Sequence, residues 1–305
     1  MSTSLISVDQ DATVASSRIA DYVELTKPKI LVLVLVTVSL ATVIGAGSNL
    51  VLWTWLHALI GTTLVAASAS MLNQLFEIST DARMPRTSKR PLPMGRLMRW
   101  EVLGLATLTV GIGLPYLWLS VNAAAAFWAF ATWSLYAFVY TPAKTRTSWN
   151  TAIGAVPGAL PVLIGWSAAG RSLDFTGVMV FAIMFCWQFP HFMAIAWLYR
   201  QHYQAANVKM LTVTDATGRS AGRLAIGMAV ATLLAAIAAG GTIASFIGIL
   251  VYAMVTVGLG VYQLYLAFQF SKNLNEGAAR SLLRFSLVYL PLQLASLTLA
   301  SVIVI

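Results

Sequence analysis

The sequence is short of charged residues. Asp, Glu, Lys and Arg make up 10% of its 305 residues, whereas a soluble domain carries roughly a quarter. Hydrophobic residues make up 59%, and the mean hydropathy is +0.79. This composition excludes an ordinary water-soluble domain and predicts a membrane protein. The one cysteine, Cys186, lies in an apolar run, so a disulfide framework is also excluded.

Carboxylates are the scarcest charged groups, ten against nineteen Lys and Arg residues. Several of the ten fall within residues 1–28, which therefore lack the basic start of a signal peptide. We interpret residues 1–28 as a cytoplasmic N-terminal tail and 29–305 as one transmembrane domain. The excess of cations does not indicate nucleic acid, and none is expected as a partner, because cytoplasmic loops of membrane proteins collect positive charge.

Apolar stretches long enough to cross a ~30 Å hydrocarbon core recur along the whole chain. Lipid offers the backbone no hydrogen-bonding partner, and the chain shows no alternating barrel pattern, so an all-α polytopic fold is predicted. The nine expected transmembrane helices cover residues 29–47, 52–76, 100–119, 122–140, 149–169, 174–199, 222–242, 244–270 and 283–304.

The cations support this count of spans. Every Lys and Arg except Arg171 falls in the N-terminal segment, in the loops after the second, fourth, sixth and eighth spans, or within the first two residues of the span that follows. The positive-inside rule then predicts a cytoplasmic N-terminus and an outside C-terminus. The loops after the second and sixth spans are about twenty residues long, and connections of that length are usually functional. We therefore expect the working face to be cytoplasmic.

The segment NQLFEISTDARMPRTSKRPLP, residues 73–93, closes the second span. Asn73, Glu77 and Asp81 are spaced i, i+4, i+8, which places their side chains on one face of a continuous helix end. Oxygen ligands suit Mg²⁺, which takes one or two carboxylates and fills its shell with substrate phosphates. Basic side chains that can bind phosphate follow at Arg83, Arg86, Lys89 and Arg90. The pattern predicts an Mg²⁺–diphosphate site, although simple pairing of these acids with neighbouring arginines is an alternative.

The segment YTPAKTRTSWN ends the fourth span. Its Lys144 and Arg146 are candidate diphosphate contacts, and Tyr140 is a candidate for facing the reacting carbon. The alternative is an interfacial tyrosine beside ordinary inside cations. In the next span, Pro157 and Pro161 lie among glycines, which indicates close helix packing and kinks that shape a cavity.

The sixth span carries His191 directly after Pro190, with Trp187 one turn earlier. An imidazole at membrane depth is costly, so it should face protein, a cavity or a ligand. It is a candidate to bind haem iron or orient a substrate, and a packed, hydrogen-bonded histidine is the alternative. Residues 200–203 should lie opposite the Asn73 cluster if the bundle closes.

Three motifs in order carry a resemblance: N-x3-E-x3-D…RT-x2-RPL, YTP-x-K-x2-TSWNT and WQFPHFMA-x-AW. They resemble the protohaem IX farnesyltransferase branch of the UbiA family of membrane prenyltransferases, over about residues 20 to 300. The resemblance implies nine helices around a central cavity. It also implies that Asn73, Glu77 and Asp81 hold Mg²⁺ and act in catalysis with Tyr140, and that His191 and Trp187 contact haem. The implied diphosphate contacts are Arg83, Lys89, Arg90, Lys144, Arg146 and Arg200.

The reaction implied by the resemblance transfers a farnesyl group from farnesyl diphosphate to the carbon-2 vinyl of haem B. It gives haem O and diphosphate, in a bacterial inner membrane. Haem A synthase or terminal-oxidase assembly factors are implied partners besides the lipid bilayer. Alternatives are a UbiA-type enzyme acting on a quinone precursor or chlorophyll, an ion or solute transporter, and an assembly factor without catalysis.

One departure from the family pattern follows the sixth span. This branch usually has acidic residues after the arginine, whereas the chain has Gln201 and His202 after Arg200. Asp215 is the nearest downstream acid. The number of Mg²⁺ ions is therefore left open: either one metal and cations bind the diphosphate, or His202 and Asp215 take part of the role.

Overall fold

The computed structural model describes residues 17–302, and it is helical throughout. Within these residues, nine helical segments are long and apolar enough to cross a membrane, which confirms the all-α prediction and its span count. The protein is an integral multi-pass membrane protein. Residues 1–16 of the expected tail lie outside the described residues. The nine segments are Pro28–Asn49, Leu52–Phe76, Arg99–Ser120, Ala123–Arg146, Asn150–Ala168, Phe175–Leu198, Arg219–Gly240, Phe246–Asn273 and Glu276–Ser301.

Most spans are single helices. The first ends in a 3₁₀ turn, the fourth joins α6, a π-helical stretch and α7, and the fifth breaks between α8 and α9. The long helices are α2 (Pro28–Ala46), α3 (Leu52–Phe76), α5 (Arg99–Ser120), α10 (Phe175–Leu198), α13 (Arg219–Gly240), α14 (Phe246–Asn273) and α15 (Glu276–Val302). The fourth and fifth spans contain α6 (Ala123–Ser134), the π-helical stretch (Leu135–Tyr140), α7 (Thr141–Arg146), α8 (Asn150–Ala159) and α9 (Pro161–Ala168). Short elements are α1 (Arg18–Leu25), a 3₁₀ turn (Gly47–Asn49), α4 (Ile78–Asp81), α11 (Arg200–Ala205) and α12 (Leu211–Thr214).

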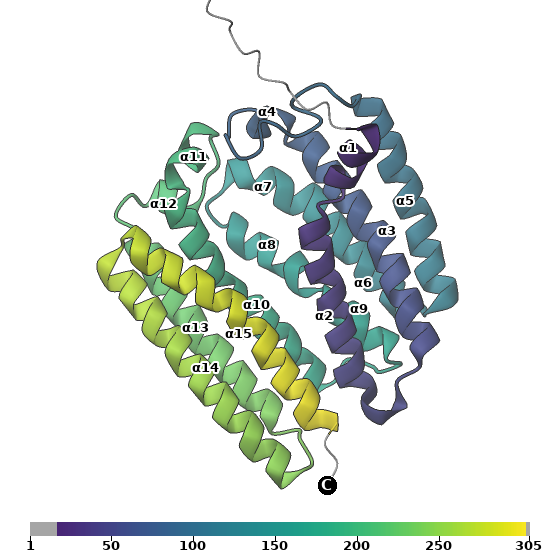
Figure 1. The fold of residues 1–305 in the computed structure, drawn as a ribbon, viewed down its shortest axis with the longest axis vertical. Coiled ribbons are helices and arrows are strands. Elements are labelled where there is room, and N and C mark those ends of the chain that lie inside the picture. The colour runs from purple at the N-terminus through teal and green to yellow at the C-terminus, as the bar shows by residue number, and fades with distance from the viewer. Residues whose placement is uncertain (1–16, 303–305) are drawn as a thin grey trace, which may run out of the picture.

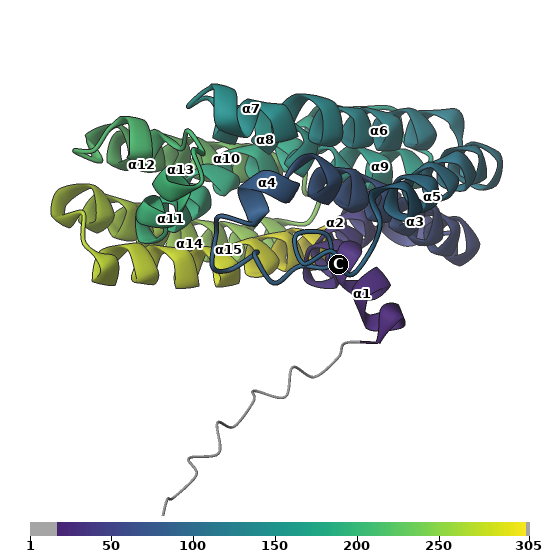
Figure 2. The same cartoon turned by 90° about the horizontal axis from the view of Figure 1, so that it is seen from above.

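The short helices gather at one end of the bundle. In Figure 1, α2, α3 and α5 lie on one side, α10 and α13–α15 lie on the other, and α8 runs between them. The connecting elements α4, α7 and α11 all lie at the same end, and Figure 2 shows α4 between the two groups of helices. We call this end the basic end, because the chain places its long, cation-rich loops there.

The close packing and the helix break predicted for the fifth span are both present. Gly165 of α9 packs against the backbone of α2, where an added Cβ would lie 2.3 Å from the Val38 carbonyl oxygen. Any larger side chain would force the two helices apart. The span breaks at Pro161, which has no N–H to continue the hydrogen-bond ladder and begins α9 at its first position.

The N-terminal segment forms a helix docked on the bundle, which the sequence analysis did not anticipate. Helix α1 is capped by Ser17, whose Oγ accepts from the Ala20 N–H at 3.2 Å. Asp21 is buried, and its carboxylate meets the Arg96 guanidinium at 2.9 Å. Helix α1 is therefore held in place directly before Lys27, the residue that precedes the first span.

Candidate active site

Three oxygen-bearing side chains, Asn73, Glu77 and Asp81, lie buried at the basic end and are called the oxygen cluster here. Their exposed fractions are 0%, 9% and 1%. The prediction that one continuous helix carries them is wrong, because α3 ends at Phe76 and Glu77 has φ −102° and ψ 8°. The turn at Glu77 starts the short helix α4, which ends at Asp81. The break directs the Glu77 carboxylate toward the fourth span.

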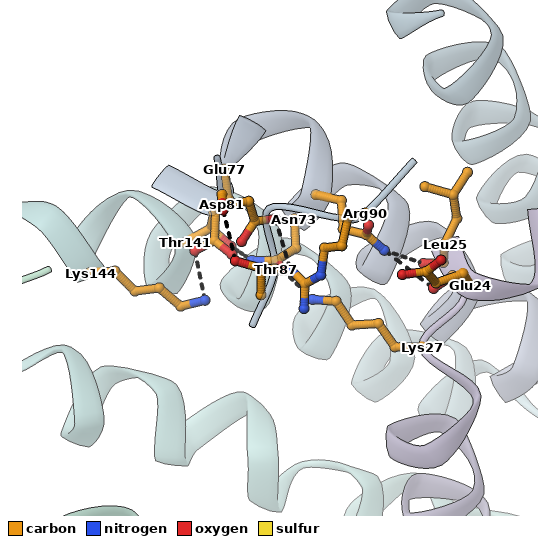
Figure 3. A network of polar contacts seen from close by, with 11 residues as sticks. Glu24, Leu25, Lys27, Asn73, Glu77, Asp81, Thr87, Arg90, Thr141 and Lys144 are labelled. Atoms are coloured by element: carbon orange, nitrogen blue, oxygen red, sulfur yellow. Dashed lines mark hydrogen bonds and ion pairs between the residues drawn. The ribbon is translucent and has the colours of Figure 1, made fainter. Parts of the chain in front are cut away.

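Both carboxylates of the oxygen cluster contact a basic side chain from another segment. Lys144 of α7 donates from Nζ to Glu77 Oε1 at 2.7 Å. Arg90, in the loop after α4, donates from Nη1 to Asp81 Oδ2 at 2.7 Å. Figure 3 shows these contacts converging from opposite sides of the cluster. The structure thus brings Lys144 and Arg90 beside the acids, and the Asp81–Arg90 contact is the kind of pairing that the sequence analysis gave as the alternative to a metal site.

Asn73 is contacted by a cation that sequence reasoning did not propose. Its Nδ2 donates to Thr141 Oγ1 at 2.9 Å, and its Oδ1 accepts from the Lys27 ammonium. Lys27 has φ 51°, in the left-handed region that few non-glycine residues adopt. The following Pro28 disfavours ordinary helical backbone at this position. The Lys-Pro pair before the first span is the available signal in the sequence, and by itself it indicates only a cytoplasmic positive charge.

The electrostatics of the cluster favour an anionic ligand. Burial lowers the pKa of Lys27 to about 7, and the neighbouring Lys144 charge acts in the same direction, while the Glu77 charge opposes it. Burial also raises the pKa of the Asp81 carboxyl, and the Arg90 charge opposes that rise. When Lys27 is protonated, three cations face two carboxylates and one amide oxygen, which is an excess of positive charge at a partly dry site.

Tyr140, the candidate for facing the reacting carbon, lies beside Lys144. The Lys144 ammonium is 4.7 Å from the centre of the Tyr140 ring, a cation–π contact. Gly154 of α8 lies against the same ring, since a Cβ there would be 2.5 Å from it. Tyr136 is a second ring 5.5 Å from that of Tyr140, centre to centre. The oxygen cluster therefore borders an aromatic wall on the side of the fourth span.

The other expected diphosphate cations are arranged less tightly. Arg200, the first residue of α11, folds back onto the end of α10, where its Nη1 donates to the Trp197 carbonyl at 2.9 Å and its guanidinium lies 4.4 Å from the Trp197 ring. In this conformation Arg200 is not directed at the oxygen cluster. The remaining three candidates are exposed side chains at the basic end: Arg83, Lys89 and Arg146.

Helix α11 packs against the loop after α4. Met84 of that loop belongs to a buried apolar cluster, and Tyr203 of α11 packs against it. The Arg86 guanidinium lies 6.0 Å from the Tyr199 ring, and His202 lines the same small hollow between the two segments. The side opposite the oxygen cluster is therefore built from aromatic, basic and imidazole groups.

Asp215 is held in a turn. Its Oδ1 accepts from Thr217 Oγ1 at 2.5 Å and from the Thr217 N–H at 3.0 Å, and its Oδ2 accepts from the Ser220 N–H at 2.9 Å. These hydrogen bonds lower the pKa of the carboxyl. They also occupy both oxygens in forming the turn before α13. This geometry does not support a shared role of His202 and Asp215 in holding a second metal.

His191 lies in α10 and is only partly buried. Its Nδ1 is 2.8 Å from Ser286 Oγ of α15, and its ring stacks on Trp187 with centres 5.1 Å apart and planes 25° apart. Trp187 is 5% exposed and donates from Nε1 to the Ser286 carbonyl at 2.8 Å. The predicted pair is thus brought together, with Trp187 buried beneath the His191 ring.

The oxygen cluster fits Mg²⁺. Two carboxylates and one amide oxygen are hard donors, and all three residues are buried at one mouth of the bundle. Within residues 17–302, no three His, Cys, Asp or Glu side chains form a group that could hold a metal ion by themselves. A metal here would need Asn73 and ligand oxygens, as expected for a cation that arrives with a diphosphate.

Comparisons with known proteins agree with this geometry. The profile of the UbiA prenyltransferase family matches residues 34–290. A Rhodopirellula baltica protein named protoheme IX farnesyltransferase is 43% identical over 284 residues, covering 91% of this chain and 98% of that protein. A structure described as digeranylgeranylglyceryl phosphate synthase in membranes matches with TM-score 0.76 at 15% identity, covering 94% and 99% of the two chains. An Archaeoglobus fulgidus UbiA homolog bound to DMAPP and Mg²⁺ matches with TM-score 0.66 at 14% identity, covering 91% and 99%. At these identities the two structures establish the fold alone.

Proposed function

The chain belongs to the UbiA prenyltransferase family, and we propose that it transfers the farnesyl group of farnesyl diphosphate to the carbon-2 vinyl of haem B. The observation that carries the diphosphate half of this proposal is the oxygen cluster, whose three buried side chains each touch a basic side chain from a different segment. The choice of haem B as the acceptor is supported by a relative named protoheme IX farnesyltransferase, which shares 43% identity over most of both chains.

Asn73, Glu77 and Asp81 would hold Mg²⁺, which when bound supplies Lewis-acid stabilisation of a leaving diphosphate. Lys27, Lys144 and Arg90 contact these oxygens in the structure and lie within reach of anything bound there. On binding, we expect these three side chains to transfer their hydrogen bonds to phosphate oxygens. Charge-assisted hydrogen bonds of this kind are stronger than those between neutral groups.

The basic side chains also act in the chemical step. As the allylic carbon–oxygen bond breaks, negative charge develops on the diphosphate, and Lys144 and Arg90 stabilise it in place. Exposed Arg83, Lys89 and Arg146 extend the positive field toward solvent and attract the substrate. Tyr140 and Tyr136 line the inner side of the site, where their rings shield the allylic cation from water.

The acceptor half of the reaction takes place deeper in the bundle. The vinyl carbon of haem B attacks the farnesyl cation and forms the new carbon–carbon bond, which leaves a cation next to the porphyrin. Water then adds there and releases a proton, which gives the hydroxyethylfarnesyl group of haem O. We assign His191 as a haem contact and Trp187 as the buried ring that supports it.

The orientation follows from the positions of the cations. The basic end, with α4, α7 and α11, faces the cytoplasm in this proposal, and the C-terminus of α15 faces the opposite side of a bacterial inner membrane. Farnesyl diphosphate then enters from the cytoplasm, and haem enters from the bilayer. A haem A synthase or an oxidase assembly factor would receive the product.

Product analysis tests the proposal. Purified protein in nanodiscs is incubated with haem B, farnesyl diphosphate and Mg²⁺, and haem O is sought by mass spectrometry. Asp81→Ala should abolish the product, whereas Glu276→Ala, an exposed acid at the start of α15, should leave it unchanged. Prenylation of a quinone precursor instead of haem would move the chain to a sister branch of the family.

A further inference from the structure

His191 is held by the protein through one of its two ring nitrogens. Within the described chain its side-chain hydrogen bond runs from Nδ1 to Ser286 Oγ, at 2.8 Å. The two residues are 95 positions apart and join α10 to α15. Ser286 is completely buried, whereas the His191 ring is only partly so. Nδ1 is therefore fixed, whereas Nε2 has no hydrogen-bond partner among the described residues.

The hydrogen bonds of Ser286 determine which nitrogen carries the proton. Its hydroxyl has one hydrogen, and Oγ lies 2.7 Å from the carbonyl oxygen of Leu283, one turn earlier in α15. A carbonyl oxygen can only accept, so the hydroxyl donates to Leu283. Ser286 Oγ must then accept from His191, which makes Nδ1 the protonated nitrogen. In a neutral imidazole, Nε2 keeps its lone pair.

A second contact fixes the plane of the ring. Trp187 stacks under His191 and donates from Nε1 to the backbone carbonyl of Ser286 at 2.8 Å. The side-chain oxygen of Ser286 thus orients the imidazole, and its backbone oxygen orients the indole beneath. Ser286 of α15 therefore contacts both aromatic rings of α10, His191 through its side chain and Trp187 through its backbone. Changing the Ser286 side chain removes only the first of these contacts.

His191 lies inside a membrane-spanning helix, below the basic end. It lies seven residues before the end of α10, or about 10 Å below the basic end at the rise of an α-helix. The oxygen cluster lies at the end of α3 on that same side of the bundle. A free imidazole nitrogen at this depth is expensive to leave without a partner in an apolar setting.

We propose that Ser286 is a positioning residue that fixes the His191 tautomer, so that Nε2 ligates the iron of the haem substrate. The proposal rests on the proposed function, since haem is taken as the acceptor. In a metal-bound histidine, the hydrogen bond that the second ring nitrogen donates to an oxygen acceptor usually sets the tautomer and the basicity of the ligand. Here that acceptor is the Ser286 hydroxyl, which donates its own proton to the Leu283 carbonyl.

Haem binding without farnesyl diphosphate tests the proposal separately from prenyl transfer. Ferric haem B is titrated into the purified protein, and the Soret band and dissociation constant are measured for wild type, Ser286→Ala, Ser286→Thr and His191→Ala. The matched control is Ser296→Ala, because Ser296 lies on the same helix and donates to the Gln293 carbonyl at 2.8 Å in the same manner.

We expect His191→Ala to lose the absorption spectrum of histidine-ligated haem. Ser286→Ala should weaken haem binding about 10- to 100-fold, the range for loss of an outer-shell partner of a metal ligand, and should shift the Soret band. Ser286→Thr, which keeps the hydroxyl, should restore both, and Ser296→Ala should change neither. A His191→Ala spectrum identical to wild type would overturn the proposal, as would unchanged ligation in a folded Ser286→Ala protein. Haem O formation in those same variants would show that the proposed function stands without it.

Discussion

Lys144 Nζ lies 2.7 Å from Glu77 Oε1, and this ion pair joins the fourth span to the second at the basic end. The lysine and the glutamate are 20% and 12% exposed in their side chains, so the pair is largely withdrawn from water. It therefore has two roles that mutations can separate. It stabilises the fold as a charge pair, and it holds a cation next to the proposed diphosphate site.

Single and double substitutions should separate these roles. Lys144→Met leaves the Glu77 carboxylate buried without its partner, which typically costs about 3–5 kcal/mol of unfolding free energy for a fully buried pair, and less for one partly exposed. Adding Glu77→Gln should recover much of that loss in a thermal unfolding assay. Haem O formation should not recover, because the cation that stabilises the leaving group is still missing and Glu77→Gln also removes the charge of a proposed Mg²⁺ ligand, and the rate should stay at least about 10²- to 10³-fold down. Recovery of activity along with stability would show that the pair is only structural.

Lys27 should take up a proton when diphosphate binds. Its pKa is lowered to about 7 in the folded protein, so much of it is neutral at pH 8, and a bound anion should raise that pKa again. Calorimetric titration with diphosphate and Mg²⁺ at pH 8, in buffers of different ionisation enthalpy, measures the uptake. Lys27→Met should abolish the uptake, and Lys29→Met, two residues away and exposed, should leave it unchanged.

The same residue predicts a trend of stability with pH. Below pH 7 both the folded and the unfolded protein hold the Lys27 proton, so the folded state carries the full cost of the buried charge. Between about pH 7 and 10.5 the unfolded protein keeps the Lys27 proton and the folded protein releases it. The destabilisation caused by Lys27 therefore becomes smaller as the pH rises. The gain in unfolding temperature of Lys27→Met over wild type should therefore be largest near pH 6 and smaller at pH 9. An equal difference at both pH values would contradict the lowered pKa.

Gly154 should be intolerant of even a methyl group. An added Cβ would lie 2.5 Å from the Tyr140 ring, so the ring must move away from Lys144. We expect Gly154→Ala to cost about 1–3 kcal/mol, the range for overpacking, and to reduce haem O formation. Gly111→Ala is the matched control, because no atom lies within 4 Å of its Cβ position and alanine favours a helix. Unfolding temperature and initial rate should both fall only in the first variant.

Much of the fold was accessible from sequence because membrane physics leaves few choices. Apolar length and the distribution of cations predicted nine helices, since lipid cannot satisfy an exposed backbone. The residues of the oxygen cluster were also predicted, because carboxylates are rare in such a chain. The helix break at Glu77 was not, since the i, i+4, i+8 spacing is compatible with an unbroken helix.

Contacts between distant segments were the part that one sequence could not supply. Lys27 reaches Asn73 across 46 positions, and Ser286 reaches His191 across 95. A lysine at the start of a span and a serine within an apolar helix are both ordinary in composition. Their roles depend on which helix faces which, and this information lies in the packed bundle.

Mg²⁺ and diphosphate should bind as a pair rather than one after the other. All three oxygens that would hold the metal already contact Lys27, Lys144 or Arg90. Metal alone must displace these cations without giving them new partners, and diphosphate alone must compete with the carboxylates. Bound together, the metal takes the acids and the phosphates take the cations.

Calorimetry should show weak binding of either component alone and at least about 10-fold tighter binding of each in the presence of the other, which is about 1.4 kcal/mol of coupling. Asp81→Asn should reduce the coupling, while Glu276→Gln, whose exposed carboxylate pairs with Arg280 away from the cluster, should preserve it. Equal affinity for Mg²⁺ with and without diphosphate would exclude this exchange of partners. The basic side chains would then stay paired with the acids whether or not a ligand is bound.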